Sequence, residues 1–122
     1  MDRPRRYLFV CAANLNRSPT AEDVFRTLAA QAGVEVEVSS AGLSPFAERP
    51  ITKDLADTAD LIFVMEDYMA RELETRYRQD RTKIVCLDVP DVYFRNDPVL
   101  VRLLKESLAS FVSQGPSRSH PS

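Results

Sequence analysis

Histidine is nearly absent from this 122-residue chain: the only one, His120, lies in a polar segment close to the carboxyl terminus. A Cys–His protease dyad and a histidine-bound metal site both need an ordered histidine, so this shortage argues against either class. Cysteine is also scarce, since only Cys11 and Cys86 are present and they form no CxxC pair. The chain is therefore not a disulfide scaffold, and we expect neither a metal ion nor a cofactor.

Other absences narrow the class of protein further. No apolar run approaches the roughly 20 residues of a membrane span, and the stretch after the basic start at residues 1–6 is too short for a signal peptide. The net charge of −2 gives no electrostatic reason to expect a nucleic acid or membrane partner. Neither GxGxxG nor a Walker loop is present, which argues against a nucleotide-binding protein. We expect a soluble, cytoplasmic protein.

The most informative stretch runs from Cys11 to Pro19, with the sequence CAANLNRSP. It follows the apolar run at residues 7–10, which predicts a buried strand, and it leads into a helical pattern that begins at Pro19. The first N–H groups of a helix have no partner within the helix, so a strand-to-helix turn is a ready site for an anion. We therefore predict that backbone N–H groups of this loop bind an oxyanion such as phosphate. The residues concerned are Ala12, Ala13, Asn14, Leu15, Asn16, Arg17 and Ser18.

Three side chains of this loop suit attack on a phosphoryl group. The helix N-terminus favours the thiolate form of Cys11, and the thiolate is the nucleophile. Arg17 offers a planar fork that can grip two oxygens at once. Ser18 is placed to cap the helix ahead of Pro19 at its first position, and its hydroxyl could donate to the Cys11 sulfur. Asn14 tolerates the left-handed backbone that a tight loop without glycine needs. The plainer alternative is that Cys11 is only a small buried hydrophobe at a strand end.

The remainder of the chain alternates strand and helix patterns. Such alternation predicts a single-domain, three-layer α/β fold in which helices flank a four-stranded parallel sheet, with the phosphate loop after the first strand. Residues 1–113 form the predicted domain, and residues 114–122 are expected to be a disordered tail. Strands are predicted at residues 7–10, 34–38, 61–65 and 83–89, and helices at residues 19–32, 51–59, from 67, and from 97. The alternating pattern of residues 34–38 is typical of a half-exposed edge strand, whereas the fully apolar runs predict central strands.

The motif Cys-x5-Arg-Ser-Pro directly after a first strand resembles the phosphate loop of the low-molecular-weight protein tyrosine phosphatases. The similarity continues in Thr20-Ala21-Glu22, in a Ser-Ala-Gly turn at residues 39–42 and in the third strand, residues 60–66. The resemblance implies a protein tyrosine phosphatase, a phosphomonoester hydrolase that acts through a cysteinyl-phosphate intermediate. Phosphotyrosine proteins or other phosphomonoesters would be its substrates, with Cys11 as nucleophile and Arg17 holding the phosphoryl group.

The general acid for the leaving oxygen must come from another loop at the carboxyl end of the sheet. In the family it follows the fourth strand, commonly as Asp-Pro with a following aromatic residue. This chain splits that pattern, because Asp91 precedes Tyr93 and Phe94 whereas Asp97 precedes proline. Asp97 has a sufficient role as a helix cap, and Asp88 is predicted to lie within the strand, so we favour Asp91. Tyr93, Phe94 and Phe46 are the predicted walls of the substrate pocket.

The chain departs from the family pattern in three places, and two other activities stay open. Ala13 stands where the family usually has glycine, and Asn16 replaces the second loop cysteine of many relatives. The segment before the third strand is also shorter, which removes part of the pocket wall. An arsenate reductase on the same scaffold is possible, although it needs a resolving thiol and Cys86 is poorly placed. The other alternative is a catalytically silent module that binds phosphate or phosphotyrosine.

Overall fold

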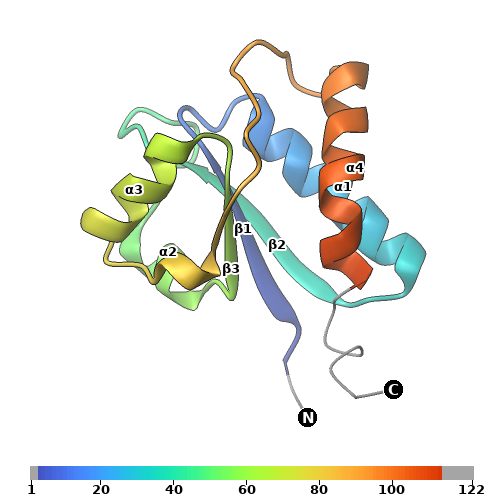
Figure 1. The fold of residues 1–122 in the computed structure, drawn as a ribbon, viewed down its shortest axis with the longest axis horizontal. Coiled ribbons are helices and arrows are strands. Elements are labelled where there is room, and N and C mark those ends of the chain that lie inside the picture. Colours follow the sequence, from blue (N-terminus) through green and yellow to red (C-terminus); the bar gives the residue numbers. More distant parts are fainter. Residues whose placement is uncertain (1–2, 114–122) are drawn as a thin grey trace.

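The protein was analysed as a computed structural model that describes residues 3–113. The predicted tail, residues 114–122, lies outside these residues. The elements follow one another as β1 (Arg5–Cys11), α1 (Arg17–Ala32), β2 (Val36–Gly42), α2 (Lys53–Thr58), β3 (Leu61–Val64), α3 (Asp67–Thr75), the 3₁₀ helix η1 (Arg81–Lys83), β4 (Ile84–Cys86) and α4 (Pro98–Ser113). All three strand pairings are parallel, in the order β2-β1-β3-β4 (Figure 1). The predicted four-stranded α/β fold is confirmed.

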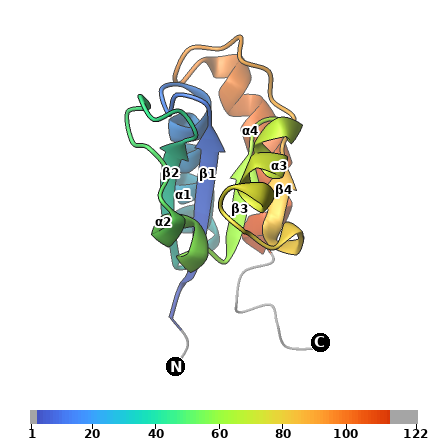
Figure 2. The same cartoon turned by 90° about the vertical axis from the view of Figure 1, so that its left-hand side faces the viewer.

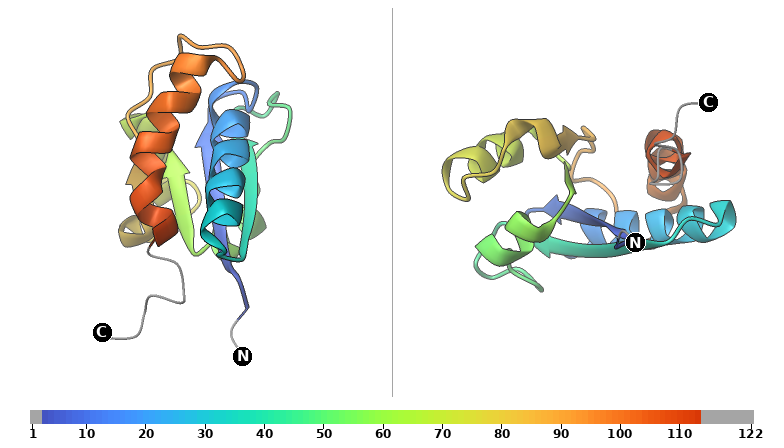
Figure 3. Two further views of the ribbon diagram at one scale, coloured as in Figure 1. Left: turned by 90° about the vertical axis from the view of Figure 1, so that its right-hand side faces the viewer. Right: turned by 90° about the horizontal axis from the view of Figure 1, so that it is seen from below.

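Helices cover both faces of this sheet. The pair α1 and α4 lies side by side on one face, as the left view of Figure 3 shows. The shorter helices α2 and α3 lie on the other face, so that the sheet is the middle of three layers (Figure 2). Successive side chains of a strand point to opposite faces, and therefore a sheet covered on both faces needs apolar residues at every central position. The runs in β1 and β3 meet that requirement.

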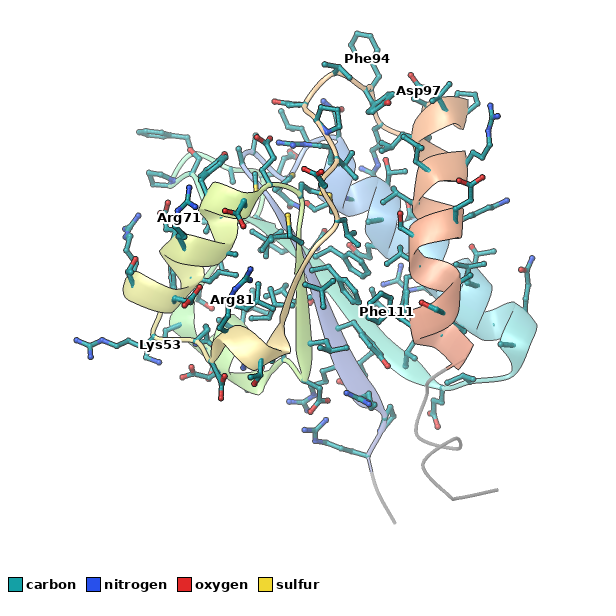
Figure 4. The ribbon with its side chains drawn as sticks, viewed as in Figure 1. Lys53, Arg71, Arg81, Phe94, Asp97 and Phe111 are labelled. Carbon is teal, nitrogen blue, oxygen red and sulfur yellow. The ribbon has the colours of Figure 1, made fainter. Side chains whose placement is uncertain are left out.

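An aromatic cluster fills the space between the sheet and the helix pair α1 and α4. Phe9 of β1 stacks on Phe63 of β3 with ring centroids 4.8 Å apart, and Phe25 of α1 lies 5.6 Å from Phe9. Phe111 meets Phe63 edge-on at 4.9 Å, pointing from α4 toward the sheet (Figure 4). Tyr7 lies 4.6 Å from Phe25 and completes the cluster. These contacts fix α1 against β1, which determines where the loop between them lies.

Several element boundaries differ from those that the sequence predicts. Residues 39–42 form the second half of β2 rather than a turn, because all of them pair with β1 from Leu8 to Cys11. The fourth strand ends at Cys86 rather than continuing to residue 89, so Asp88 lies in a loop and has a positive φ of 59°. Helix α1 begins at Arg17, two residues before the predicted start, and ends as expected at Gly33 with a left-handed φ of 71°. The predicted second helix is shortened to Lys53–Thr58.

The strand order places the loop after β1 at a switch point. From β1 the chain passes to β2 on one side, and it returns to β3 on the other side. In open parallel sheets, ligands bind at the carboxyl ends of the strands at such a point. Of the helices in residues 3–113, none is long and apolar enough to cross a lipid bilayer.

Candidate active site

The phosphate loop is a compact turn between the end of β1 and the start of α1. Asn14 adopts the predicted left-handed conformation, with φ of 57°, and its backbone N–H donates to the Cys11 sulfur at 3.2 Å. The first hydrogen bond of α1 runs from Thr20 N to Asn16 O at 3.1 Å. The N–H groups of Arg17 and Ser18 therefore precede the helical ladder and are among the free donors that a helix N-terminus presents.

The outer side of the phosphate loop is held by the segment that follows β2. The N–H groups of Leu43, Ser44 and Glu48 donate to the carbonyl oxygens of Cys11, Ala12 and Ala13, each at 3.0 Å. A peptide unit whose C=O points outward directs the N–H on its far side inward. These three bonds therefore favour the inward orientation of the N–H groups that an oxyanion needs.

Ser18 does not cap the helix, contrary to the prediction. Asn16 is the N-cap residue, and Pro19 is the third helical residue rather than the first. The Ser18 hydroxyl instead lies 3.0 Å from the Cys11 sulfur, as predicted for a donor to that atom. The Asn14 carboxamide donates to the Ser18 oxygen at 2.8 Å. Since that oxygen already accepts a hydrogen bond, the hydroxyl proton is available to the sulfur.

The network behind Cys11 extends to a carboxylate. Asn14 donates its second amide proton to Ser40 of β2 at 3.0 Å, and the Ser40 hydroxyl donates to Glu22 at 2.7 Å. Because Glu22 only accepts when it is ionised, the Ser40 hydroxyl donates to it and accepts from Asn14. The Ser18 hydroxyl has two possible acceptors, the Cys11 sulfur at 3.0 Å and the Ala41 carbonyl at 3.5 Å. The Glu22 carboxylate is balanced by Arg26 at 2.7 Å. Four of these residues are fully or nearly buried, which strengthens the network electrostatically.

Arg17 is anchored by the protein through one of its three nitrogens. Its Nη1 donates to Glu66 at 2.5 Å and to the Val89 carbonyl at 2.8 Å, and the side chain is 3% exposed. Within the described part of the chain, its Nε and Nη2 donate no hydrogen bond, although Nε lies 3.8 Å from Asp91. An anchored guanidinium with two adjacent free donors can hold a phosphoryl group in a bidentate fashion.

The predicted site residues are only partly brought together. A hollow of about 110 Å³ is lined by Cys11, Ala13, Leu15, Asn16, Arg17 and Asp91. The proposed acid Asp91 thus lies at the same hollow as the nucleophile. Phe46, Tyr93 and Phe94 do not line it, and Phe46 and Phe94 are 94% and 80% exposed. Figure 4 shows Phe94 at the tip of its loop, pointing away from the molecule, with Asp97 at the start of α4.

Two larger hollows, of about 250 and 290 Å³, lie elsewhere on the molecule. The first lies over the amino-terminal half of β1, between β2 and α2, and the second lies between α1 and α4. Neither is lined by a cysteine. The small hollow at the carboxyl end of β1 is therefore the candidate site, because it alone of the three combines a nucleophile with a buried arginine.

Sequence reasoning missed three residues around this hollow. Glu66 was assigned only to the third strand, although a carboxylate directly after a central strand lies at the same sheet edge as the loop after β1. Ser40, 26 residues from Asn14, gave no signal of its own. Tyr68 at the start of α3 is 44% exposed, and burial together with the charge of nearby Glu66 raises the pKa of its hydroxyl. The charges of Arg17 and Asp91, two residues that line the hollow, also act on this hydroxyl.

Comparisons with known proteins agree with this geometry. The family model described as low molecular weight phosphotyrosine protein phosphatase matches residues 6–50, which include the whole phosphate loop and β2. A protein-arginine-phosphatase of Bacillus subtilis is 28% identical over 102 residues, which cover 66% of this chain and 68% of that protein. The low molecular weight protein-tyrosine-phosphatase YfkJ of the same organism is 29% identical over 110 residues, covering 80% and 69%.

Among solved structures, the tyrosine phosphatase Wzb from Escherichia coli K30 in complex with phosphate shares the fold. Its TM-score is 0.74 at 20% identity, and the match covers 92% of this chain and 99% of Wzb. The four-stranded sheet and its flanking helices are therefore those of a known phosphatase fold, despite the shortened segment before β3.

Proposed function

This chain belongs to the low molecular weight phosphotyrosine protein phosphatase family, and we propose that it hydrolyses phosphotyrosine in protein substrates through a cysteinyl-phosphate intermediate. The observation that carries this proposal is the environment of the Cys11 sulfur. It accepts the Asn14 N–H at 3.2 Å and lies 3.0 Å from the Ser18 hydroxyl, beside the buried guanidinium of Arg17. This sulfur, with a backbone N–H and a guanidinium beside it, is the nucleophile of the proposed reaction.

The first chemical step transfers the phosphoryl group to sulfur. Backbone N–H groups of the phosphate loop and the Nε and Nη2 atoms of Arg17 hold the three non-bridging oxygens. The Cys11 thiolate attacks phosphorus in line, the bond from phosphorus to the phenolic oxygen breaks, and Asp91 protonates the leaving oxygen. Asp91 is suited to this role because it lies at the same hollow as Cys11 and its side chain is 65% exposed, open to an entering substrate.

The second step releases phosphate. Asp91, now ionised, takes a proton from a water molecule, which attacks phosphorus and breaks the S–P bond. Inorganic phosphate leaves, and the thiolate and the protonated acid are restored. Positioning and fixed charge supply the catalysis in this scheme, with the loop N–H groups and Arg17 stabilising the charge that spreads over the equatorial oxygens.

The identity of the leaving group distinguishes the two activities found among the relatives. Leu15, 51% exposed, contributes an apolar side chain to the rim of the hollow. An apolar rim favours the ring of phosphotyrosine, whereas the guanidinium of phosphoarginine needs polar partners. Phosphoarginine is nevertheless a second candidate, because the carboxylate of Asp91 lies at the same rim and because one relative is a protein-arginine-phosphatase.

Arsenate reduction is disfavoured by the position of Cys86. Cys86 pairs with Val64, which in turn pairs with Val10, so two strand spacings separate the backbone at Cys86 from that of β1. At about 4.8 Å per spacing the separation is about 10 Å, beyond the roughly 7 Å reach of a disulfide between Cα atoms. Cys86 is thus poorly placed to resolve an adduct on Cys11.

The test compares one purified enzyme on three substrates: a phosphotyrosine peptide, the matching phosphoarginine peptide and arsenate with a thiol reductant. We expect hydrolysis of phosphotyrosine with the highest kcat/KM, and a loss on the order of 10³-fold or more in Cys11→Ser. A tenfold preference for phosphoarginine would reassign the substrate to that class. Phosphate binding without turnover of any substrate would instead identify a silent binding module.

A further inference from the structure

The loop that carries Asp91 is held at both of its ends by residues of the phosphate loop and the first turn of α1. At its start, the Val89 carbonyl accepts from Nη1 of Arg17 at 2.8 Å. At its end, the backbone N–H of Arg95 donates to the Asn16 carboxamide oxygen at 3.0 Å, and that of Asn96 donates to the Thr20 hydroxyl at 2.9 Å. We call the last two bonds the clasp.

The Asn16 side chain bonds to the Arg95 N–H instead of capping α1, which is the contact expected at its position. Asparagine is among the best N-cap residues, because its side chain usually accepts from the second or third N–H of the helix. Asn16 is the N-cap of α1, yet it makes no side-chain cap hydrogen bond. Its oxygen is turned to Arg95, 79 residues away in the sequence. Because Pro19 at the third helical position has no N–H, the group that a cap would use is the Ser18 N–H, which is thereby left for the oxyanion.

Thr20 joins the two parts of the clasp. Its hydroxyl donates to the Asn16 carbonyl at 2.7 Å and accepts from the Asn96 N–H at 2.9 Å. Thr20 is fully buried, so its hydroxyl is held in a fixed position to accept from the Asn96 N–H. Asn96 itself has a positive φ of 64°, which turns the chain at this point toward α4.

Between these anchors, Tyr93 packs against the core, and the residues on either side of it are largely exposed. Asp91, Val92 and Phe94 are 65%, 72% and 80% exposed. The position of the Asp91 carboxylate therefore depends on where the two ends of its loop are fixed. Holding a catalytic group to within a fraction of an ångström is worth a large factor in rate.

We propose that the clasp formed by Asn16 and Thr20 positions the general acid Asp91 over the phosphate loop, so that these two residues are positioning residues for leaving-group protonation. This inference rests on the proposed function. It also gives a role to the Asn16 side chain, which makes no cap hydrogen bond at the start of α1. The clasp links the oxyanion site and the acid through two hydrogen bonds that only the tertiary structure creates.

The test uses two esters that differ in their need for an acid. Phenyl phosphate has a poor leaving group, which must be protonated, whereas 2,4-dinitrophenyl phosphate has a good one, which leaves without a proton. The readout is kcat/KM, which reports steps up to and including the first phosphoryl transfer. In Thr20→Val, which keeps the shape but removes the hydroxyl, we expect about a tenfold loss on phenyl phosphate and less than threefold on the dinitrophenyl ester.

Further variants separate positioning from folding. Thr20→Ser retains the hydroxyl and is expected to restore activity on phenyl phosphate, together with the basic limb of its pH–rate profile. Asn16→Ala is expected to change the ratio between the two esters in the same direction as Thr20→Val. Asp23→Asn is the control, because the Asp23 carboxylate forms exposed ion pairs with Arg95 at 3.5 Å and Arg26 at 3.7 Å, and their loss should leave both esters unchanged.

The outcomes distinguish this inference from the proposed function. Equal losses on both esters in Thr20→Val and Asn16→Ala, or no loss on either, would overturn the positioning role while the phosphatase activity stands. A wild-type enzyme that hydrolyses neither ester would overturn the proposed function, and the inference would fall with it. Retained turnover of the dinitrophenyl ester also shows that a variant is folded.

Discussion

At the scale of single residues, two aspartates of one loop have different roles because their neighbours differ. The Asp97 carboxylate accepts the Val99 N–H at 2.9 Å and caps α4 ahead of Pro98, as the sequence indicated. Asp91 has no such bond and lies 3.8 Å from Nε of Arg17, at the hollow that contains Cys11. The cap satisfies a structural need, whereas Asp91 lies where the proposed reaction needs an acid.

Replacement of each aspartate by asparagine tests this division. Asp91→Asn should lose about 10²-fold or more in kcat/KM on phenyl phosphate and should lose the basic limb of the pH–rate profile. Asp97→Asn is a matched control, since asparagine caps a helix about as well as aspartate. This variant should keep the wild-type kcat/KM and the basic limb of the pH–rate profile. If instead Asp97→Asn alone abolishes the basic limb, the acid has been assigned to the wrong residue.

At the scale of elements, the segment after β2 and the phosphate loop form one unit, and Gly42 allows their close approach. A Cβ at this position would lie 2.5 Å from the Ala47 side chain and 2.7 Å from the Ala12 carbonyl oxygen. Neither neighbour is the end of a flexible side chain. The hydrogen bonds from residues 43–48 to the phosphate-loop carbonyls depend on this approach.

Gly42→Ala should therefore damage the site as well as the fold. We expect destabilisation of about 1–3 kcal/mol, as for other overpacked positions, with weaker phosphate binding and at least a tenfold loss in kcat/KM. The matched control is Gly33→Ala, where φ is 71° but no atom lies within 4 Å of the new Cβ. That variant should lose about 1–2 kcal/mol with normal kinetics. Urea denaturation and phosphate titration measure the two effects; unchanged phosphate affinity in Gly42→Ala would contradict this account.

At the scale of the whole molecule, a carboxylate with three hydrogen bonds and the candidate active site lie at opposite ends of the sheet. At the amino end, Asp60 accepts two hydrogen bonds from Arg3, at 2.8 and 3.1 Å, and one from the Arg6 N–H at 2.7 Å. The Arg3 hydrogen bond, followed by that from the Arg6 backbone, holds the pKa of Asp60 below its ordinary value. The catalytic hollow lies beyond the other end of β1.

The lowered pKa of Asp60 makes the free energy of unfolding depend on pH, and the sign of this dependence follows from the direction of the shift. Because the pKa of Asp60 is lower in the folded state, its contribution to stability is present above the unfolded pKa of about 3.9 and is lost as the pH falls through the folded value. Asp60→Asn should therefore have a lower urea midpoint than wild type at about pH 6, and the difference should shrink toward about pH 3. Turnover at neutral pH should be unchanged. A constant difference across this range would contradict the assignment.

The sequence by itself determined the elements that depend on local pattern. Fully apolar runs gave β1 and β3, because a strand covered on both faces needs no polar alternation. Helical spacing gave the inward faces of α1 and α4, and Gly33 gave the end of α1. The left-handed turn at Asn14 and the nearness of the Ser18 hydroxyl to the Cys11 sulfur also followed from local geometry. Each of these depends on residues close together in the chain.

Only the tertiary structure decided which distant groups meet at the sheet edge. Ser40 reaches Asn14, Glu66 reaches Arg17 and Asn16 reaches Arg95 because parallel pairing brings the carboxyl ends of all four strands to one edge of the sheet. The errors at Ser18 and Asp88 have other causes: the Ser18 hydroxyl lies against the Cys11 sulfur instead of capping α1, and Asp88 has a positive φ after β4 ends at Cys86. Local sequence pattern determines whether a segment forms a helix, a strand or a turn, whereas hydrogen bonds between distant segments determine which partners its side chains have.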